Sequence, residues 1–245
     1  MNKTSEYRFT IISPVYNEEG NIERLAKTLG EYLEKASEKS ICVLFVNDGS
    51  SDRSLELIEK ECAARERFFF ISLKERTGLS GAIKAGFDNT FSPLVGYIDA
   101  DLQTTPEDFD LLLPYADEYP LVMGIRANRK DTPWKRFQSK FGNGFRKMFT
   151  HDGALDTGCP LKILQTAYAK RVPMFTGMHR FFPALIQLQK GGKMMQVPVR
   201  HFPRTAGVSK YNALNRMLGP MKDCFAYRWM KKRYLNYEVG ENNLK

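Results

Sequence analysis

The stretch FTIISPVYNEEGNIERLAKTLGEYLEKASEKSICVLFVNDGSS, residues 9–51, indicates how the chain folds. It opens with a β-branched apolar run, Phe9–Val15, and closes with a second apolar run, Cys42–Val46. Between them, apolar residues recur at helical spacing from Ile22 to Ala36. A strand, an amphipathic helix and a second strand in this order predict a βαβ unit with parallel strands.

The same alternation continues downstream of this unit. Apolar positions predict a second helix through Leu55, Ile58 and Cys62, a third strand at Phe68–Leu73, a third helix through Leu79, Ala82, Ile83, Gly86 and Phe87, and a fourth strand at Leu94–Ile98. Strands that alternate with helices at this spacing predict an α/β domain with a mostly parallel central sheet. We find no internal repeat or linker in the sequence, so one folded unit is expected.

Polar turns follow three of these strands: Tyr16–Glu18, Asn47–Ser51 and Asp99–Gln103. In an open parallel sheet, ligands bind beyond the carboxyl ends of the strands. The three turns are therefore expected to converge on one binding site. A structural interpretation of the first two turns is helix capping, by Asn17 and Ser51.

Asp99 and Asp101 are two carboxylates one residue apart at the end of an apolar strand. Both can reach one hard divalent cation, Mg²⁺ or Mn²⁺, and the side-chain carbonyl of Gln103 can add a ligand. Such a cation would neutralise charge on a departing nucleotide diphosphate. Tyr16 is suited to stacking on a base, and Asp48 to accepting hydrogen bonds from a base or a ribose. The alternative for the acidic pair is turn chemistry, because Asp is common in turns.

Composition excludes several classes of protein. The chain has 245 residues, 42% hydrophobic and 27% charged, as is ordinary for a globular domain. It has no Walker motif and no GxGxxG after the first strand, and its three histidines form no HExxH pair. Its four scattered cysteines are expected to be free thiols. No apolar run approaches the roughly 18 residues of a spanning helix and no signal pattern is present, so the sequence predicts a cytoplasmic chain without its own anchor.

Charge is divided unevenly along the chain. Residues 1–120 hold 13 basic and 22 acidic side chains, whereas residues 121–235 hold 23 basic and 4 acidic ones. The second half is therefore expected to meet an anionic partner: a phosphorylated ligand, an anionic lipid headgroup or a nucleic acid. Nucleic acid is disfavoured, since no nucleic-acid-binding motif is present and the acidic first half would repel a phosphate backbone.

Several of these segments resemble glycosyltransferase family 2, whose fold is called GT-A. The resemblance rests on PVYNE at Pro14–Glu18, VNDGSSD at Val46–Asp52, the segment Gly78–Gly86, DADLQ at Asp99–Gln103 and RTAGVSKY at Arg204–Tyr211. The DADLQ and RTAGVSKY runs are similar to the corresponding segments of one branch of this family, whose members transfer sugars to polyprenyl phosphates. The resemblance implies a GT-A nucleotide-sugar-binding domain over residues 1–210 and a basic amphipathic segment over residues 211–245, part of the same unit.

The resemblance also implies roles for individual residues. The nucleotide-sugar pocket would comprise Pro14, Tyr16, Glu18, Val46, Asp48, Asp99, Ala100, Asp101, Gln103, Arg204 and Lys210, of which Asp99, Asp101 and Gln103 would hold the metal. The acceptor phosphate would be bound by Arg126, Arg129 and Ser139, and the catalytic residues would be Asp101, Arg126 and Arg129. Two departures from the family pattern are present: Asn47 replaces a first aspartate, and Thr104–Glu107 replaces a turn with two prolines.

Two basic segments carry apolar residues at helical spacing. The first, residues 133–149, has Trp134, Phe137, Phe141, Phe145 and Met148 along one side. The second, residues 214–235, has Leu214, Met217, Leu218, Met221, Phe225 and Trp229, with a break expected at Gly219–Pro220. Basic amphipathic helices with aromatic residues suit the interface of an anionic membrane. The alternative is packing of the apolar side on the domain; it stays open for the first segment, and for the second the interface is favoured.

Together these features predict an inverting, metal-dependent transfer of a sugar from a UDP- or GDP-linked donor to a polyprenyl phosphate. The enzyme would be peripheral on the inner face of the cytoplasmic membrane, alone or docked on a membrane protein. A transferase acting on a sugar hydroxyl is the alternative within the family, but it needs a carboxylate base in a region with few acids. A nucleotide-binding scaffold without catalysis is disfavoured by the intact pair Asp99 and Asp101.

Overall fold

A computed structural model describes residues 2–126, 144–200, 215–237 and 240–241, with the backbone alone described at 215–218 and 220. The elements, in chain order, are η1 (Lys3–Glu6), β1 (Phe9–Val15), α1 (Ile22–Lys35), β2 (Ile41–Asn47), α2 (Ser54–Ala63), β3 (Phe68–Ser72), α3 (Gly78–Asn89), β4 (Leu94–Tyr97), η2 (Pro106–Asp108), α4 (Phe109–Leu112), η3 (Leu113–Tyr115), β5 (Leu121–Arg126), β6 (Lys162–Gln165), α6 (Thr166–Lys170), η4 (Met178–Phe181), α7 (Phe182–Gln187), β7 (Met194–Val199) and α8 (Asn215–Arg233). A further helical segment covers residues 144–150.

The strands form one seven-stranded sheet in the order β3-β2-β1-β4-β6-β5-β7. β6 is antiparallel to both β4 and β5, and the other neighbours are parallel. The predicted α/β fold with a mostly parallel sheet is confirmed. Each of the four predicted strands begins and ends within one residue of its predicted bounds.

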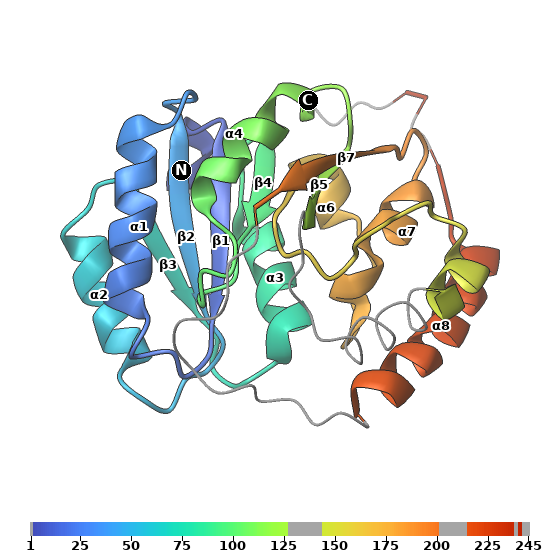
Figure 1. The fold of residues 1–245 in the computed structure, drawn as a ribbon, viewed down its shortest axis with the longest axis horizontal. Coiled ribbons are helices and arrows are strands. Elements are labelled where there is room, and N and C mark those ends of the chain that lie inside the picture. Colours follow the sequence, from blue (N-terminus) through green and yellow to red (C-terminus); the bar gives the residue numbers. More distant parts are fainter. Residues whose placement is uncertain (1, 127–143, 201–214, 238–239, 242–245) are drawn as a thin grey trace.

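Helices cover both faces of the sheet, so the domain has three layers (Figure 1). On one face α1, α2 and α4 pack against a fully buried cluster that includes Ile11. On the other face α3, α6, α7 and α8 pack against a second cluster that includes Ile12. Because successive side chains of a strand point to opposite faces, β1 contributes to both clusters and is buried on both sides.

Two local predictions are wrong. Asn17 and Ser51 do not cap helices, because α1 begins only at Ile22 and α2 only at Ser54. Instead, the Ser51 backbone N–H donates to Asn17 Oδ1 at 2.8 Å and Asn17 Nδ2 donates to Ser51 Oγ at 3.2 Å, which joins the two loops. The break expected at Gly219–Pro220 is absent, and α8 runs through it. A proline removes one hydrogen bond from a helix and can be accommodated by bending.

Other predictions are confirmed or stay open. The four cysteines are free thiols, as expected. No helix within the described ranges is long and apolar enough to cross a bilayer. The predicted boundary near residue 210 lies outside the described residues and stays a prediction, although α8 packs on the same core as α3.

Gly96 of β4 provides a test of this packing. A methyl group there would lie 2.5 Å from the backbone oxygen of Lys162 and 3.0 Å from the Phe9 ring. Gly96→Ala is expected to lower the free energy of unfolding by about 1–3 kcal/mol, because strand backbone and a buried ring cannot easily give way. Urea unfolding measures the loss, with Gly20→Ala as the control, since a methyl group at Gly20 meets nothing within 4 Å. Equal midpoints for the two variants would contradict the packing of β4.

Candidate active site

Three strand ends meet at one edge of the sheet. β1 lies between β2 and β4, and its Pro14 and Val15 are level with Val46 and Asn47 of β2. β4 leaves the sheet at the same edge and leads into the turn Asp99–Gln103. The predicted convergence of the three polar turns is therefore confirmed.

Hydrogen bonds join these turns to one another. Ser50 Oγ, after β2, accepts from the backbone N–H of Asn17, after β1, at 3.0 Å. Arg24 of α1 donates to the backbone oxygen of Asp101 at 3.4 Å. The loops after β1 and β2 thus support each other, and α1 supports the loop after β4.

The carboxylates of Asp99 and Asp101 are partly exposed, whereas Ala100 between them is buried. The turn is tight: Leu102 has φ +53°, and the Gln103 backbone N–H donates to Asp101 Oδ1 at 3.1 Å. Within the described ranges, no three acidic, His or Cys side chains gather into a metal site. Two partly exposed carboxylates fit a Mg²⁺ or Mn²⁺ ion that takes its remaining ligands from water and substrate phosphates.

Asp48 has a structural role that sequence reasoning did not identify. It is 3% exposed, and its Oδ1 accepts from the Thr77 backbone N–H at 2.6 Å and from Thr77 Oγ1 at 2.8 Å. Its Oδ2 accepts from the Gly78 backbone N–H at 2.8 Å. The carboxylate thereby holds the N-terminus of α3 against the end of β2. Its predicted contact with the nucleoside stays a prediction.

The other predicted nucleoside residues lie around the same edge. The guanidinium of Arg76 lies 4.2 Å from the centroid of the Tyr16 ring, a cation–π contact that orients the ring. Glu18 accepts from Asn21 Nδ2 at 2.6 Å, and Pro14 is half-buried at the end of β1. The Val46 side chain is fully buried in the α3-side cluster and belongs to the core.

Arg126, the last residue of β5, forms a two-pronged ion pair with Asp156. Arg126 Nε donates to Asp156 Oδ2 at 2.7 Å and Nη2 donates to Oδ1 at 2.8 Å. The Arg126 backbone N–H also donates to Oδ2, at 3.2 Å. Gly158 permits this approach, because a methyl group there would lie 2.8 Å from Nη2. Asp156 therefore fixes the orientation of the guanidinium, a partner that sequence analysis missed.

Lys162, at the start of β6, is a fully buried lysine that sequence analysis also missed. Its ammonium donates to Tyr97 Oη at 3.1 Å and to the backbone oxygen of Cys159. Burial lowers the pKa of Lys162, while the charges of Asp156 and Asp99 act in the opposite direction. A lysine is almost never fully buried unless its charge is paired. The available signal was a lysine within the apolar run Leu161–Leu164.

A second polar contact joins α3 to the turn before α7. Ser80 Oγ lies 2.7 Å from His179 Nδ1 and accepts from the Gly177 backbone N–H at 3.0 Å. The hydroxyl can donate to Nδ1 or accept from it, so the direction of this bond depends on the tautomer of the imidazole. Burial, assisted by the positive charges of Arg180 and Lys162, lowers the pKa of His179 to about 3. This contact holds η4 against the first turn of α3.

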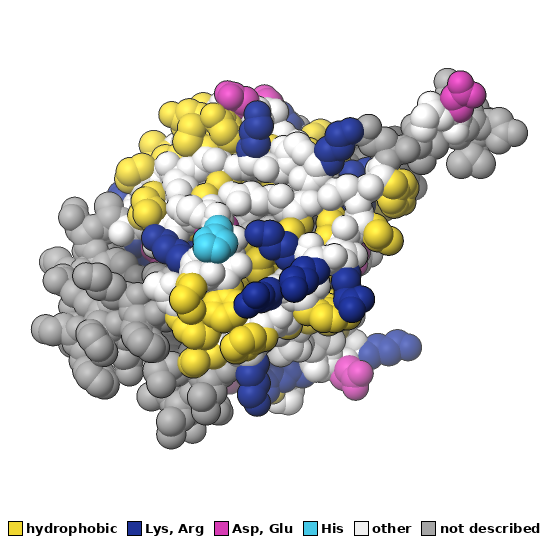
Figure 2. Space-filling model, turned by 90° about the vertical axis from the view of Figure 1, so that its right-hand side faces the viewer, with side chains coloured by type: hydrophobic (Ala, Val, Ile, Leu, Met, Phe, Trp, Pro, Cys, Tyr) yellow, Lys and Arg dark blue, Asp and Glu magenta, His cyan; other side chains and the backbone are white. Residues whose placement is uncertain are grey.

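The amphipathic helix α8 has two distinct faces. Cys224, Tyr227 and Met230 are buried against the domain, whereas Phe225 and Trp229 are 58% and 62% exposed. Sequence analysis identified the exposed aromatic pair but not the buried face. Figure 2 shows this side of the molecule, where hydrophobic side chains gather among lysines and arginines. We call the surface formed by Lys147, Met148, Phe149, Lys222, Phe225, Arg228, Trp229, Lys231, Lys232 and Arg233 the basic-aromatic face.

The 144–150 helix belongs to this face. The rings of Phe149 and Phe225 meet edge to face with centroids 5.0 Å apart, and Met148 is 60% exposed. Arg146 points the other way and is buried in an ion pair with Asp152. Four predicted site residues lie outside the described residues: Arg129, Ser139, Arg204 and Lys210. The apolar positions of residues 133–143 lie outside them as well.

Solved structures share this fold. Glucosyl-3-phosphoglycerate synthase of Mycobacterium tuberculosis, bound to Mn²⁺, UDP and glucosyl-3-phosphoglycerate, superposes with a TM-score of 0.67 at 14% identity, over 94% of this chain and 82% of that one. A mannosyltransferase of Pyrobaculum calidifontis, bound to GDP-mannose and Mn²⁺, does so with a TM-score of 0.61 at 17% identity, over 91% and 69%. The three-layer fold is thus the GT-A fold of these enzymes.

Sequence comparison identifies the family. The family model described as glycosyl transferase family 2 matches residues 10–174, and this chain belongs to that family. Undecaprenyl-phosphate 4-deoxy-4-formamido-L-arabinose transferase of Edwardsiella ictaluri is 33% identical over 217 residues, 87% of this chain and 66% of its own length. The protein of the same name from Pseudomonas aeruginosa is 33% identical over 220 residues, 87% of this chain and 63% of its own length. The chain thus spans just under two thirds of these curated relatives.

The neutral imidazole of His179 makes the fold sensitive to acid. Its pKa is about 3 against the usual 6.5, so below pH 6.5 the unfolded chain takes up a proton that the folded chain does not. This effect is absent above pH 6.5, and it lowers the free energy of unfolding by about 1.4 kcal/mol per pH unit as the pH falls toward 3. His179→Gln should flatten this dependence in urea denaturation between about pH 7 and pH 5. The exposed His151, changed to Gln, is the control and should keep the parental slope; a parental slope in His179→Gln would contradict a neutral imidazole.

Proposed function

We propose that this chain transfers a sugar from a nucleotide sugar to a polyprenyl phosphate, with inversion at the anomeric carbon. The observation that carries the proposal is the carboxylate pair Asp99 and Asp101 at the edge where β1, β2 and β4 end. The acceptor class is supported by relatives named as undecaprenyl-phosphate transferases. The donor class is supported by structural neighbours that hold UDP or GDP-mannose together with Mn²⁺.

The donor would lie across the carboxyl edge of the sheet. Its nucleoside would contact Tyr16, whose ring is oriented by Arg76, and the turn that contains Asp48. Its diphosphate would lie at Asp99 and Asp101. These carboxylates, with Gln103, would hold Mg²⁺ or Mn²⁺, which supplies positive charge to the leaving diphosphate. Arg204 and Lys210 are proposed to complete the donor site on its diphosphate side.

The acceptor phosphate would be bound by Arg126, Arg129 and Ser139. Asp156 holds the guanidinium of Arg126 through Nε and Nη2 and so orients it before any substrate arrives. An oxygen of the lipid phosphate attacks the anomeric carbon, and the bond from this carbon to the nucleotide diphosphate breaks on the opposite face. A phosphate monoester, with a second pKa of about 6, is already largely ionised near neutrality, so no strong base is required. Catalysis then depends on positioning and on electrostatic stabilisation.

A sugar hydroxyl acceptor would place a different demand on the site. It needs a carboxylate to take up the hydroxyl proton, and Asp156 lies beside Arg126, which is proposed to bind the acceptor. Both oxygens of Asp156 already accept hydrogen bonds from Arg126. This engagement favours the phosphate acceptor.

We also propose that the enzyme works as a peripheral protein on the inner face of the cytoplasmic membrane. The basic-aromatic face combines exposed apolar rings with at least six cationic side chains, which suits an anionic lipid surface. Docking on a membrane protein through the same face is the related alternative.

The proposed metal dependence is tested at Asp101. Asp101→Ala removes a charged oxygen ligand, so turnover should fall by about 100-fold or more, equivalent to about 2.7 kcal/mol. Transfer is assayed with undecaprenyl phosphate and a panel of UDP- and GDP-sugars, before and after EDTA and after return of Mn²⁺ or Mg²⁺. Glu107→Gln, at an exposed carboxylate six residues further on, is the control and should keep parental activity. Full activity in excess EDTA would contradict the proposed requirement for a metal ion.

Membrane binding is tested by flotation with vesicles that contain anionic lipid. Binding of the parent should weaken with salt, because the Debye length falls from about 10 Å at 0.1 M to about 3 Å at 1 M. Changing both Phe225 and Trp229 to Ser should remove most of the binding that salt leaves, with a nearly unchanged melting temperature, since both rings are exposed.

The control for membrane binding changes Phe91 and Leu111 to Ser, because both are also exposed but lie on other elements. This control should float like the parent. Two results would contradict the proposal: a parent that never floats with anionic vesicles at low salt, or an aromatic double variant that floats as well as the parent.

A further inference from the structure

Arg180 lies in η4, a turn that is held rigidly. Met178 and Phe181, on either side of the His179–Arg180 pair, are 2% and 1% exposed and belong to the α3-side core. The Gly177 backbone N–H and the His179 ring both bond to Ser80 Oγ of α3. The backbone that carries Arg180 is therefore fixed to the first turn of α3.

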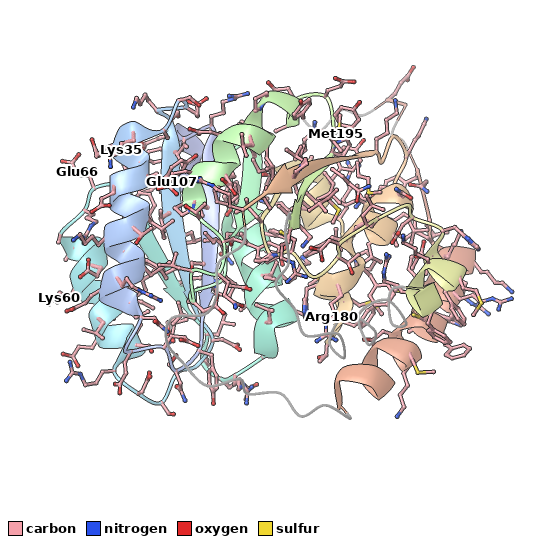
Figure 3. The ribbon with its side chains drawn as sticks, viewed as in Figure 1. Lys35, Lys60, Glu66, Glu107, Arg180 and Met195 are labelled. Carbon is pink, nitrogen blue, oxygen red and sulfur yellow. The ribbon has the colours of Figure 1, made fainter. Side chains whose placement is uncertain are left out.

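This turn lies between the proposed active site and the basic-aromatic face. The ring of Phe182, two residues after Arg180, lies 6.1 Å from the ring of Tyr97, which is two residues before Asp99. On the opposite side, a methyl group at Gly177 would lie 2.6 Å from Asp223 Oδ2, so α8 packs directly against the turn. Figure 3 accordingly places Arg180 between α3 and α8.

The guanidinium of Arg180 is half-buried and has no hydrogen bond or ion pair with any side chain in the described part of the chain. The acid beside it, Asp223, has a pKa raised by burial, which the charge of Arg180 only partly offsets. Removing part of the hydration of a cation costs free energy when no anion makes a direct contact with it. A bound anion would supply such a contact.

We propose that Arg180 binds the phosphate monoester of the lipid acceptor, an inference that rests on the proposed function. The planar guanidinium can donate two parallel hydrogen bonds to a phosphate. The pair Arg126 and Asp156 carries no net charge. Arg129, which is also proposed for the acceptor phosphate, adds a single positive charge, so a phosphate dianion leaves room for a further cation at the site. A lipid that reaches the site from the basic-aromatic face would pass η4 before it reaches Asp99.

The position of Arg180 is the reason for assigning it to the acceptor phosphate and not to the donor diphosphate. Asp99 and Asp101 lie at the edge formed by β1, β2 and β4, where the donor diphosphate is proposed to bind. Arg180 approaches from the α7 and α8 side, beyond the Ser80–His179 contact. An anion held there would lie on the acceptor side of the site.

The test measures the binding of farnesyl phosphate by calorimetry without any donor, so it does not depend on turnover. Arg180→Gln should weaken this binding by about 10-fold or more and raise the acceptor KM by a similar factor, because a charge-assisted bidentate contact is lost. The affinity for UDP or GDP in the presence of Mn²⁺ should change by less than about 2-fold. Arg180→Lys should restore part of the binding, since it keeps the charge but not the fork.

Arg171→Gln is the matched control, because it removes one positive charge from an exposed position at the end of α6. It should leave both affinities unchanged. If Arg180→Gln melts well below the parent, its binding data are set aside and the inference is judged on Arg180→Lys alone. Weaker binding of farnesyl phosphate by Arg180→Lys than by the parent, with an unchanged nucleotide affinity, supports the inference.

Three results would overturn the inference: no binding of farnesyl phosphate by the parent, parental binding by the Arg180 variants, or a loss confined to nucleotide affinity. The last result would assign Arg180 to the donor diphosphate. Failure of the proposed function looks different: the parent would bind farnesyl phosphate but transfer no sugar from any donor.

Discussion

The parallel pairing of β1 with both β2 and β4 is the constraint on which the site depends. β1 is buried on both faces and bonded along both edges, so its direction and register determine where its neighbours end. Three loops with little regular structure are thereby brought to one edge. Their own contacts, such as those between Asn17 and Ser51, then set their shapes. A rigid central strand can thus position polar groups that the loops alone could not hold.

Charge in the second half of the chain is used in three different ways. Arg126 is held in an ion pair, and Lys162 is buried among neutral oxygens within the influence of Asp99 and Asp156. Arg180 forms no ion pair among the described residues, although its charge acts on Asp223. Each arrangement has a different cost of desolvation. Arg126 and Arg180 are proposed to bind the acceptor phosphate, whereas Lys162 interacts with the charges of both Asp99 and Asp156.

The uneven charge of the sequence becomes an uneven surface in the fold. The acidic first half supplies α1, α2 and the edge where β1, β2 and β4 end, and the basic second half supplies α8 (Figure 1). α8 is anchored by Cys224, Tyr227 and Met230, which leaves Phe225 and Trp229 outward. The turn that carries Arg180 connects this face to the site, because Gly177 lets α8 approach and Ser80 holds the other side.

The sequence by itself determined the first four of the seven strands, the first three α-helices and the polar turns, because these depend on local periodicity and on where apolar runs end. It also indicated the acidic pair, since Asp99 and Asp101 are neighbours in the chain. Only the tertiary structure decided the contacts of Arg126 with Asp156, Lys162 with Tyr97 and Ser80 with His179, whose members are 30, 65 and 99 residues apart. It also decided which face of α8 is buried, because apolar residues occur on more than one side of this helix. Such contacts depend on which elements pack together, and a pattern read along one segment carries no information about the segment that will lie against it.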